Sequence, residues 1–316
     1  MTPQNQTSAT EFFLLGFSDL PRQQLVLFLV FLTMYLLTLL GNTAIVYSII
    51  KDTRLHSPMY FFLSNLSLAD GSFTSVTIPK LLTDLFLVER TISFYGCMTQ
   101  MYFFISLGNT ESNLLGVMAY DRYVAICHPL HYSIVMGRKW CALLAAASWI
   151  SACLHSLLHT IMASILYYCG PNHIHHFFCE IALVIKLSCT DITPNELAIY
   201  TEGAVSVMVP FVCILVSYIH IIAAILKIRS KEGRIQTFST CSSHLIVVTL
   251  FYGTIFSIYF RPSQPSDSSL LKDRLVTVMY TMLTPMLNPF IYGLRNKAIK
   301  VALRKVLLRK EFHHNT

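Results

Sequence analysis

Long apolar runs, separated by short polar or charged stretches, dominate the pattern of this chain. Seven runs reach the length of about 20 mostly apolar residues that a helix needs to cross a bilayer. We place the spans at about 25–50, 57–80, 96–122, 140–167, 197–227, 238–260 and 273–292. The pattern predicts an all-α membrane protein, a seven-transmembrane helix bundle at residues 25–292 with tails at 1–24 and 293–316.

The composition agrees with this interpretation. Only 12% of the 316 residues are charged and 54% are hydrophobic, whereas a soluble domain usually carries roughly 25% charged residues. With the N-terminus outside, the inner segments hold 16 of the 23 Lys and Arg residues and the outer segments hold 7. Because positive residues favour the cytoplasmic side, we expect an extracellular N-terminus and a cytoplasmic C-terminus. The net charge of +7 therefore indicates membrane orientation, and no nucleic-acid partner is expected.

Both tails carry a local signal. Asn5 opens the tripeptide Asn-Gln-Thr, an N-glycosylation acceptor, in the predicted outer tail. From Arg295 onward, apolar residues such as Ile299, Val301 and Leu303 alternate with bases. This predicts a short amphipathic eighth helix on the anionic inner leaflet. A solvated basic tail is the alternative.

Four of the nine cysteines fall on the predicted outer side: Cys97, Cys169, Cys179 and Cys189. Four outer cysteines in an oxidising compartment suggest two disulfides, in any of three pairings. Histidines at 173, 175 and 176 lie between two of these cysteines, and imidazoles with thiols would suit Zn²⁺ or Cu⁺. Because oxidised sulfur is no thiolate ligand, we predict no metal site there.

Four sequence stretches identify a family. Residues 118–132 read MAYDRYVAICHPLHY and close the third span, and residues 56–70 read HSPMYFFLSNLSLAD. TFSTCSSHL at 237–245 opens the sixth span, and PMLNPFIY at 285–292 closes the seventh. Together they resemble the olfactory receptor family of rhodopsin-like G-protein-coupled receptors, over nearly the whole chain. Gln236-Thr237 and Gly293 depart from the usual pattern, but neither removes a charged or aromatic residue that the mechanism needs.

The resemblance to this family also implies a function for the protein. It implies a receptor, not an enzyme, that binds a small volatile odorant in the outer half of the bundle. It implies activation of a stimulatory, olfactory-type G protein α subunit with its βγ partner, which raises cAMP. The expected location is the plasma membrane, as a multi-pass protein in the cilia of olfactory sensory neurons. The resemblance also pairs Cys97 with Cys179 and Cys169 with Cys189.

The inner end of the third span is the expected coupling site. We expect Arg122 to pair with Asp121 at rest and to be freed when the bundle opens on its inner side. Its guanidinium would then lie against a helix end of the partner, where unpaired carbonyls carry partial negative charge. The residues predicted for coupling and activation are Asp121, Arg122, Tyr123, Tyr218, Asn288, Pro289 and Tyr292.

Two acids, Asp70 and Glu111, fall in the middle of predicted spans, where ionisable groups are expensive and usually functional. If the second and third spans pack together, the two carboxyl groups would share a proton or hold a cation such as Na⁺. The amides of Asn42 and Asn288 would add oxygens or donors. We interpret the group as a hydrated switch, and a static hydrogen-bonded plug is the alternative.

Helical spacing selects the residues of the predicted odorant pocket. Glu202 and the histidines at 155 and 159 are its polar members, and they either anchor a ligand head group or satisfy one another in the core. The predicted ligand-binding residues are Phe104, Ile105, Gly108, Asn109, Ser112, His155, His159, Glu202, Ser206, Tyr252, Ile255, Phe256, Tyr259 and Thr281.

Two other classes of membrane protein would also place polar residues inside the bilayer. A transporter usually shows internal repeats and broken helices, and we find no repeat in this sequence. A membrane hydrolase needs a nucleophile with a base in reach, and no such signature accompanies the histidines at 155 and 159. A measurement of transport or turnover on the purified protein would separate these classes from a receptor.

Overall fold

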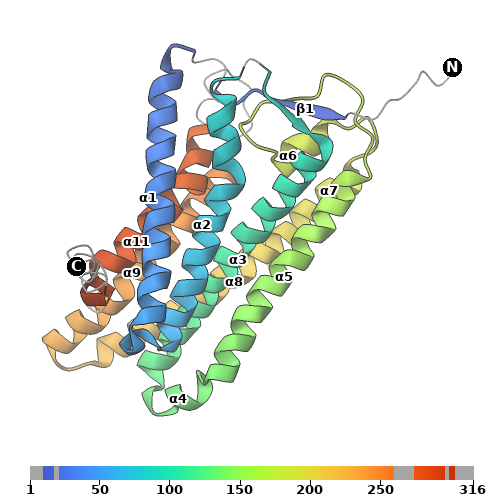
Figure 1. The fold of residues 1–316 in the computed structure, drawn as a ribbon. Coiled ribbons are helices and arrows are strands. Elements are labelled where there is room, and N and C mark those ends of the chain that lie inside the picture. The colour runs from blue at the N-terminus through green and yellow to red at the C-terminus, as the bar shows by residue number, and fades with distance from the viewer. Residues whose placement is uncertain (1–9, 18–20, 88, 260–273, 296–298, 303–316) are drawn as a thin grey trace, which may run out of the picture.

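The structure is a computed structural model, and it describes residues 10–17, 21–87, 89–259, 274–295 and 299–302. Most of these residues are helical, and the long helices run alongside one another as a bundle (Figure 1). The long helices are α1 (Gln24–Lys51), α2 (Pro58–Asp84), α3 (Phe94–Cys127), α5 (Arg138–Ser164), α8 (Ala204–Lys227), α9 (Lys231–Tyr259) and α11 (Thr284–Arg295). The shorter helices are α4 (Tyr132–Val135), α6 (Ile181–Val184) and α7 (Thr193–Ala198).

Two of the helical runs contain a π-helical segment. Helix α7 continues through the π segment Ile199–Gly203 into α8, and helical residues 274–278 continue through the π segment Met279–Leu283 into α11. Hydrogen bonds in a π turn skip one more residue than those of an α-helix. Each segment therefore changes which side chains face the bundle before and after it.

Helix α3 lies inside the bundle and packs against α2, α5 and α8. Its first turn is capped by the Ser93 hydroxyl, which accepts a hydrogen bond from the Gly96 N–H at 3.1 Å. At Gly116 the backbone of α3 comes close to α8, since a Cβ there would lie 3.3 Å from the Cβ of Pro210. A larger residue at this position would require α8 to shift by a few tenths of an ångström, so Gly116 favours the close packing of α3 on α8.

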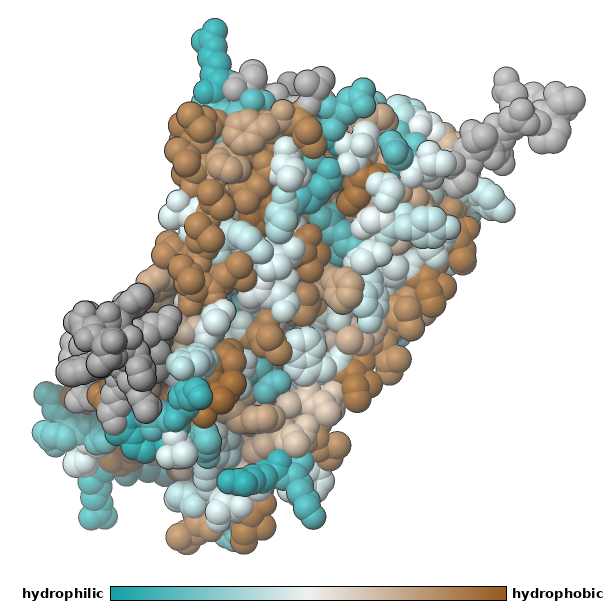
Figure 2. Space-filling view, viewed as in Figure 1, coloured by the Kyte–Doolittle hydropathy of each residue, from teal (hydrophilic) through white to brown (hydrophobic). Residues whose placement is uncertain are grey.

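The outer surface of the bundle is apolar. Exposed residues such as Leu25, Leu29 and Leu40 cover α1, and Figure 2 shows hydrophobic residues gathered over α1 and along α5. Within the described residues, four stretches are long and apolar enough to cross a membrane: Gln24–Lys51, Arg138–Ser164, Thr193–Lys227 and Lys231–Ser257. Helices α2 and α3 are comparably long but contain buried polar residues, so their lower hydropathy reflects their place inside the bundle.

A small sheet covers one end of the bundle. Strand β1 (Glu11–Leu14) pairs antiparallel with β2 (Thr91–Ser93) and parallel with β3 (His173–Ile174). In Figure 1, β1 lies at the same end as α6 and α7, and α4 lies at the opposite end. We call the end with the sheet the outer end and the end with α4 the inner end. The all-α prediction omitted this sheet, because three strands of four residues or fewer give no readable alternation.

Three sequence predictions fall outside the described residues. Asn5, the predicted glycosylation acceptor, precedes residue 10, and the side chain of Tyr259 is not among those described. Most of the predicted amphipathic eighth helix also lies outside, although residues 299–302 are helical. Of these, Ile299 and Ala302 are buried and join the apolar cluster that contains Tyr292.

Strand β1 provides a matched pair of residues that tests the sheet. Phe12 is fully buried against the rings of Phe94 and Tyr168, whereas Phe13 is 38% exposed. We predict that Phe12→Ala lowers the free energy of unfolding by about 3–5 kcal/mol, as expected for a buried Phe, and that Phe13→Ala costs less than half of that. Thermal unfolding of the purified protein measures both. Equal effects would contradict the burial of β1 in the outer end.

Candidate functional site

A cavity of about 170 Å³ lies in the outer half of the bundle. It is enclosed by α3, α8, α9, the helical run that precedes α11 and the loop that follows β3. Its lining residues are Phe104, Ile105, Gly108, Asn109, Ser112, Phe178, Cys179, Glu180, Ile181, Ala182, Ile199, Val207, Phe251, Ile255, Thr277 and Tyr280. The walls are mostly apolar and aromatic with a few polar groups, which is typical of a site for a small molecule.

The α3 residues predicted for the pocket line this cavity. These residues are Phe104, Ile105, Gly108, Asn109 and Ser112. Ile255 of α9, which was also predicted for the pocket, lines the cavity as well. Two further predicted residues pack behind the wall. The Tyr252 hydroxyl lies 2.8 Å from the Ser112 hydroxyl, and the ring of Phe256 packs on Phe211 at 5.0 Å.

The other predicted pocket residues lie outside the lining. His155 and His159 face each other on α5 with ring centroids 4.5 Å apart. The Ser206 hydroxyl donates to the Gly203 carbonyl at 2.9 Å, and the Thr281 hydroxyl donates to the Thr277 carbonyl at 2.8 Å. Each of these two hydroxyl groups therefore donates its hydrogen bond to a backbone carbonyl of its own helical run.

Of the two alternatives for Glu202 and the histidines at 155 and 159, the structure does not support the one in which they satisfy one another. Glu202 is exposed, and across the described residues no hydrogen bond or ion pair joins it to either histidine. The physical reason is the π segment Ile199–Gly203, because α-helical spacing no longer predicts a shared face across a π turn.

Sequence reasoning missed ten of the 16 residues that line the cavity, and five of those ten come from one segment, Phe178 to Ala182. Phe178, Cys179 and Glu180 reach the cavity because a disulfide joins Cys179 to Cys97 at the start of α3, with Cα atoms 5.5 Å apart. The Phe178 ring packs on Phe104 at 4.4 Å. The disulfide pairing was therefore the signal that could have placed this loop over the cavity.

Tyr280 was missed for a different reason. It belongs to the π segment Met279–Leu283, and its ring packs against Phe73 of α2 and Phe251 of α9 at 5.3 and 5.7 Å. A Cβ on Gly108 would lie 2.6 Å from the Tyr280 hydroxyl oxygen. Gly108 is thus the position at which the cavity and the Tyr280 hydroxyl meet.

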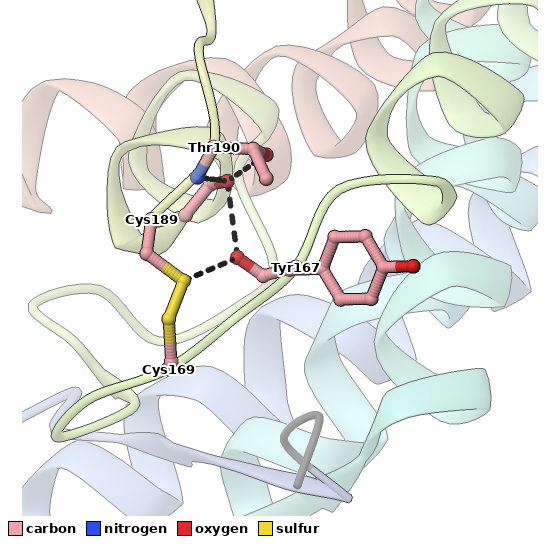
Figure 3. The surroundings of a disulfide bond; sticks show 5 residues. Tyr167, Cys169, Cys189 and Thr190 are labelled. Atoms are coloured by element: carbon pink, nitrogen blue, oxygen red, sulfur yellow. Dashed lines mark hydrogen bonds between the residues drawn. A yellow bond between two sulfur atoms is a disulfide. The ribbon is translucent and has the colours of Figure 1, made fainter. Parts of the chain in front are cut away.

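The second disulfide, between Cys169 and Cys189, closes the base of the same loop (Figure 3). The Cys189 N–H donates to the Tyr167 carbonyl at 2.9 Å, and the Ser188 hydroxyl donates to the same carbonyl at 3.1 Å. Both disulfides that the family resemblance implies are therefore present. The loop is fixed at two points, one beside α5 and one on α3.

The histidines of this loop are spread over different environments. His173 and His175 are exposed, whereas His176 is buried with its Nε2 atom 3.3 Å from the Thr277 hydroxyl. Burial and the nearby Arg274 charge lower the pKa of His176 to about 3, so the ring is neutral at physiological pH. In the described parts of the chain, no three or more His, Cys, Asp and Glu side chains are grouped as metal ligands would be.

A second polar site lies deeper, between α2, α3 and α11. The Asn288 amide donates to the Asp70 carboxyl at 2.8 Å, and the Asp70 and Glu111 carboxyl groups interact directly. The Asn42 amide donates to the Thr38 and Pro285 carbonyls. One oxygen on each of Asp70, Glu111, Asn42 and Asn288 is buried without a hydrogen-bond partner in the structure. The predicted proximity of the two acids is present, with several oxygen atoms left to accept a ligand.

At the inner end, Arg122 and Asp121 have separate partners. Arg122 donates to the Thr240 carbonyl of α9, and Asp121 accepts a hydrogen bond from the Tyr132 hydroxyl at 2.8 Å. No ion pair joins Asp121 to Arg122 in the residues described, so the prediction that they pair is wrong. Consecutive residues of a helix point about 100° apart and do not face each other. Arg122 instead ties α3 to α9.

Further bonds strengthen this inner tie between α3, α8 and α9. The Tyr218 hydroxyl lies 2.8 Å from Nδ1 of His244, whose Nε2 lies 3.1 Å from the Leu115 carbonyl oxygen. Arg122 and Tyr292 also line an inner cavity of about 710 Å³, and the Tyr292 hydroxyl is buried there without a hydrogen-bond partner in the structure. The Tyr123 hydroxyl lies 3.0 Å from His128, and Pro289 packs on Gly41.

Comparison with known proteins agrees with this arrangement. Residues 31–310 match the family model described as olfactory receptor. The chain is 54% identical to rat olfactory receptor 1f45 over 97% of both chains, and 52% identical to gorilla olfactory receptor 1G1 and to human olfactory receptor 1F1 over 99% of both chains in each case. The chain therefore belongs to the olfactory receptor family, whose members are odorant-binding G-protein-coupled receptors of the membrane and not enzymes.

Proposed function

We propose that this receptor binds a small volatile odorant in the outer cavity and then activates a stimulatory, olfactory-type G protein, which raises cAMP. The observation that carries the proposal is that one helix, α3, contributes both to the outer cavity and to the inner tie through Arg122. A ligand that shifts α3 against α9 at one end therefore acts on the contact between the same two helices at the other end.

The outer cavity suits a ligand with an apolar body. Its volume of about 170 Å³ is below the usual range of about 300–1,000 Å³ for drug-sized ligands, and a volatile molecule is correspondingly small. Aromatic rings at 104, 178, 251 and 280 are among the groups that form its wall. The Asn109 amide and the Ser112 hydroxyl offer hydrogen bonds for a head group.

The inner end supplies the coupling step. Arg122 is buried and holds the Thr240 carbonyl, so outward movement of α9 would release its guanidinium into the inner cavity. A free guanidinium suits the C-terminal end of a partner helix. The unpartnered Tyr292 hydroxyl stands in the same cavity and can accept or donate a new bond once Tyr218 leaves His244.

The Asp70 and Glu111 site fits a sodium ion or a shared proton. Its unpartnered oxygens belong to carboxyl and amide groups, which are hard ligands that suit a small cation. A cation held between α2, α3 and α11 would stabilise the resting arrangement of those three helices. We assign the site the role of a switch between resting and active arrangements.

We also infer the orientation and location of the receptor. Both disulfides belong to the outer end, and disulfides persist in oxidising compartments, which supports an extracellular outer end. The bias of Lys and Arg toward the predicted inner segments favours the same orientation. The spans and tails predicted from the sequence remain our assignment of the receptor's domains, and the proposed location is the plasma membrane of olfactory cilia.

The proposed function is tested by a broad odorant screen with a cAMP readout, in cells that carry the olfactory-type α subunit. We expect at least one odorant to raise cAMP through the wild-type receptor. We expect Arg122→Gln to reduce that rise at least tenfold while surface expression and odorant binding persist, since Arg122 lies far from the outer cavity. A full cAMP response from Arg122→Gln would contradict the role given to this residue.

The switch is tested by exchanging extracellular Na⁺ for choline. If Na⁺ stabilises the resting state, its removal should raise odorant potency severalfold in the wild type. Asp70→Asn and Glu111→Gln should each abolish that sodium effect and change basal cAMP. Unchanged basal and odorant-evoked signalling in both variants would contradict the switch and favour the alternative, a static hydrogen-bonded group.

A further inference from the structure

Glu180 is the one charged side chain that lines the outer cavity in the described part of the chain. Its neighbour Cys179 is fixed twice, by the disulfide to Cys97 and by its N–H, which donates to the Gln100 side chain at 2.9 Å. The Glu180 carbonyl accepts from the N–H groups of Leu183 and Val184 at the start of α6. The backbone that carries the carboxyl group is therefore rigid.

The carboxyl group of Glu180 is not used by the fold. Glu180 occupies the N-cap position of α6, where an acidic side chain normally accepts a backbone N–H, but its side chain makes no cap bond. Lys186, a basic residue that acts on it, is exposed, and no ion pair joins the two among the described residues. Both carboxylate oxygens remain available to a ligand.

The surroundings of this carboxyl group are those of a cavity wall. Glu180 is half-buried, and burial raises the pKa of its carboxyl group against the opposing effect of Lys186. Because Glu180 is among the residues that line the outer cavity, we take its accessible surface to face that space. The same cavity is lined by Phe104, Ile105 and Phe178, whose apolar side chains suit an alkyl chain.

We propose that Glu180 binds the head group of the odorant, and that this receptor prefers small apolar molecules with a cationic amine, then an alcohol, and rejects carboxylic acids. A carboxylate only accepts hydrogen bonds, so it favours donors and above all charged donors. An odorant carboxylate would instead bring a second negative charge into a confined apolar space. The inference rests on the outer cavity being the odorant site.

The test uses probes that share one six-carbon chain: hexylamine, 1-hexanol, hexanal and hexanoic acid. For the wild-type receptor we expect potency to fall in that order. Glu180→Gln keeps the size of the side chain and removes its charge, so hexylamine should lose at least tenfold in potency while hexanal changes less than threefold. Glu180→Asp should keep the preference for the amine at reduced potency.

A matched control is Glu196→Gln on α7, an acid of the outer end that does not line the cavity. It should leave the order of the probes unchanged. A wild-type receptor that responds best to hexanoic acid, or a Glu180→Gln receptor with unchanged amine potency, would overturn the inference. Surface labelling of each variant separates loss of recognition from loss of expression.

Failure of this inference is distinguishable from failure of the proposed site. Gly108→Ala pushes a methyl group toward the Tyr280 hydroxyl and should alter the response to every probe, whereas Gly253→Ala enters open space and should alter none. If Gly108→Ala alters the odorant responses and Glu180→Gln does not, the cavity remains the odorant site and the role proposed for Glu180 is contradicted. A hexylamine-dependent rise in Tm of the purified receptor, lost in Glu180→Gln, would support Glu180 even without a cAMP signal.

Discussion

The disulfide between Cys97 and Cys179 is the constraint on which the outer half of this receptor depends. It holds a loop from distant sequence over the first turns of α3, and the loop brings Phe178 and Glu180 to the cavity. Strand β1 pairs with β3 of the same loop and with β2, so the N-terminal segment packs on the loop that the disulfide holds in place. Without this bond the cavity would lack its outer wall.

Helix α3 connects the outer cavity with the inner end of the bundle. At the outer end its residues form one wall of the cavity, in the middle Glu111 meets Asp70, and at the inner end Arg122 holds α9. Each of these polar groups is buried, and a buried polar group without a partner is costly. The bundle therefore favours discrete arrangements in which these groups exchange partners, which is the behaviour that a switch needs.

The sequence predicted those features that follow from regular helices and from the family motifs. The α3 face from Phe104 to Ser112 lines the cavity because α3 is an unbroken α-helix, so its spacing can be read directly. Glu202 was misplaced because a π segment changes the phase of its helix, and no sequence signal marks that segment. The Arg122–Asp121 pair was misread because residues adjacent in sequence were assumed to be adjacent in space. The loop residues depend on long-range contacts that periodicity does not report.

The central claim is that the outer cavity and the Arg122 tie are two ends of one mechanical unit. It is tested most directly by spin labels at the inner end, one at Ser133 on α4 and one at Gln236 on α9, in the purified receptor with its exposed cysteines replaced. Double electron–electron resonance then measures the distance between them. An odorant that saturates the outer cavity should lengthen this distance by several ångströms, and the change should disappear when the odorant is removed. An unchanged distance at saturating odorant would contradict the account.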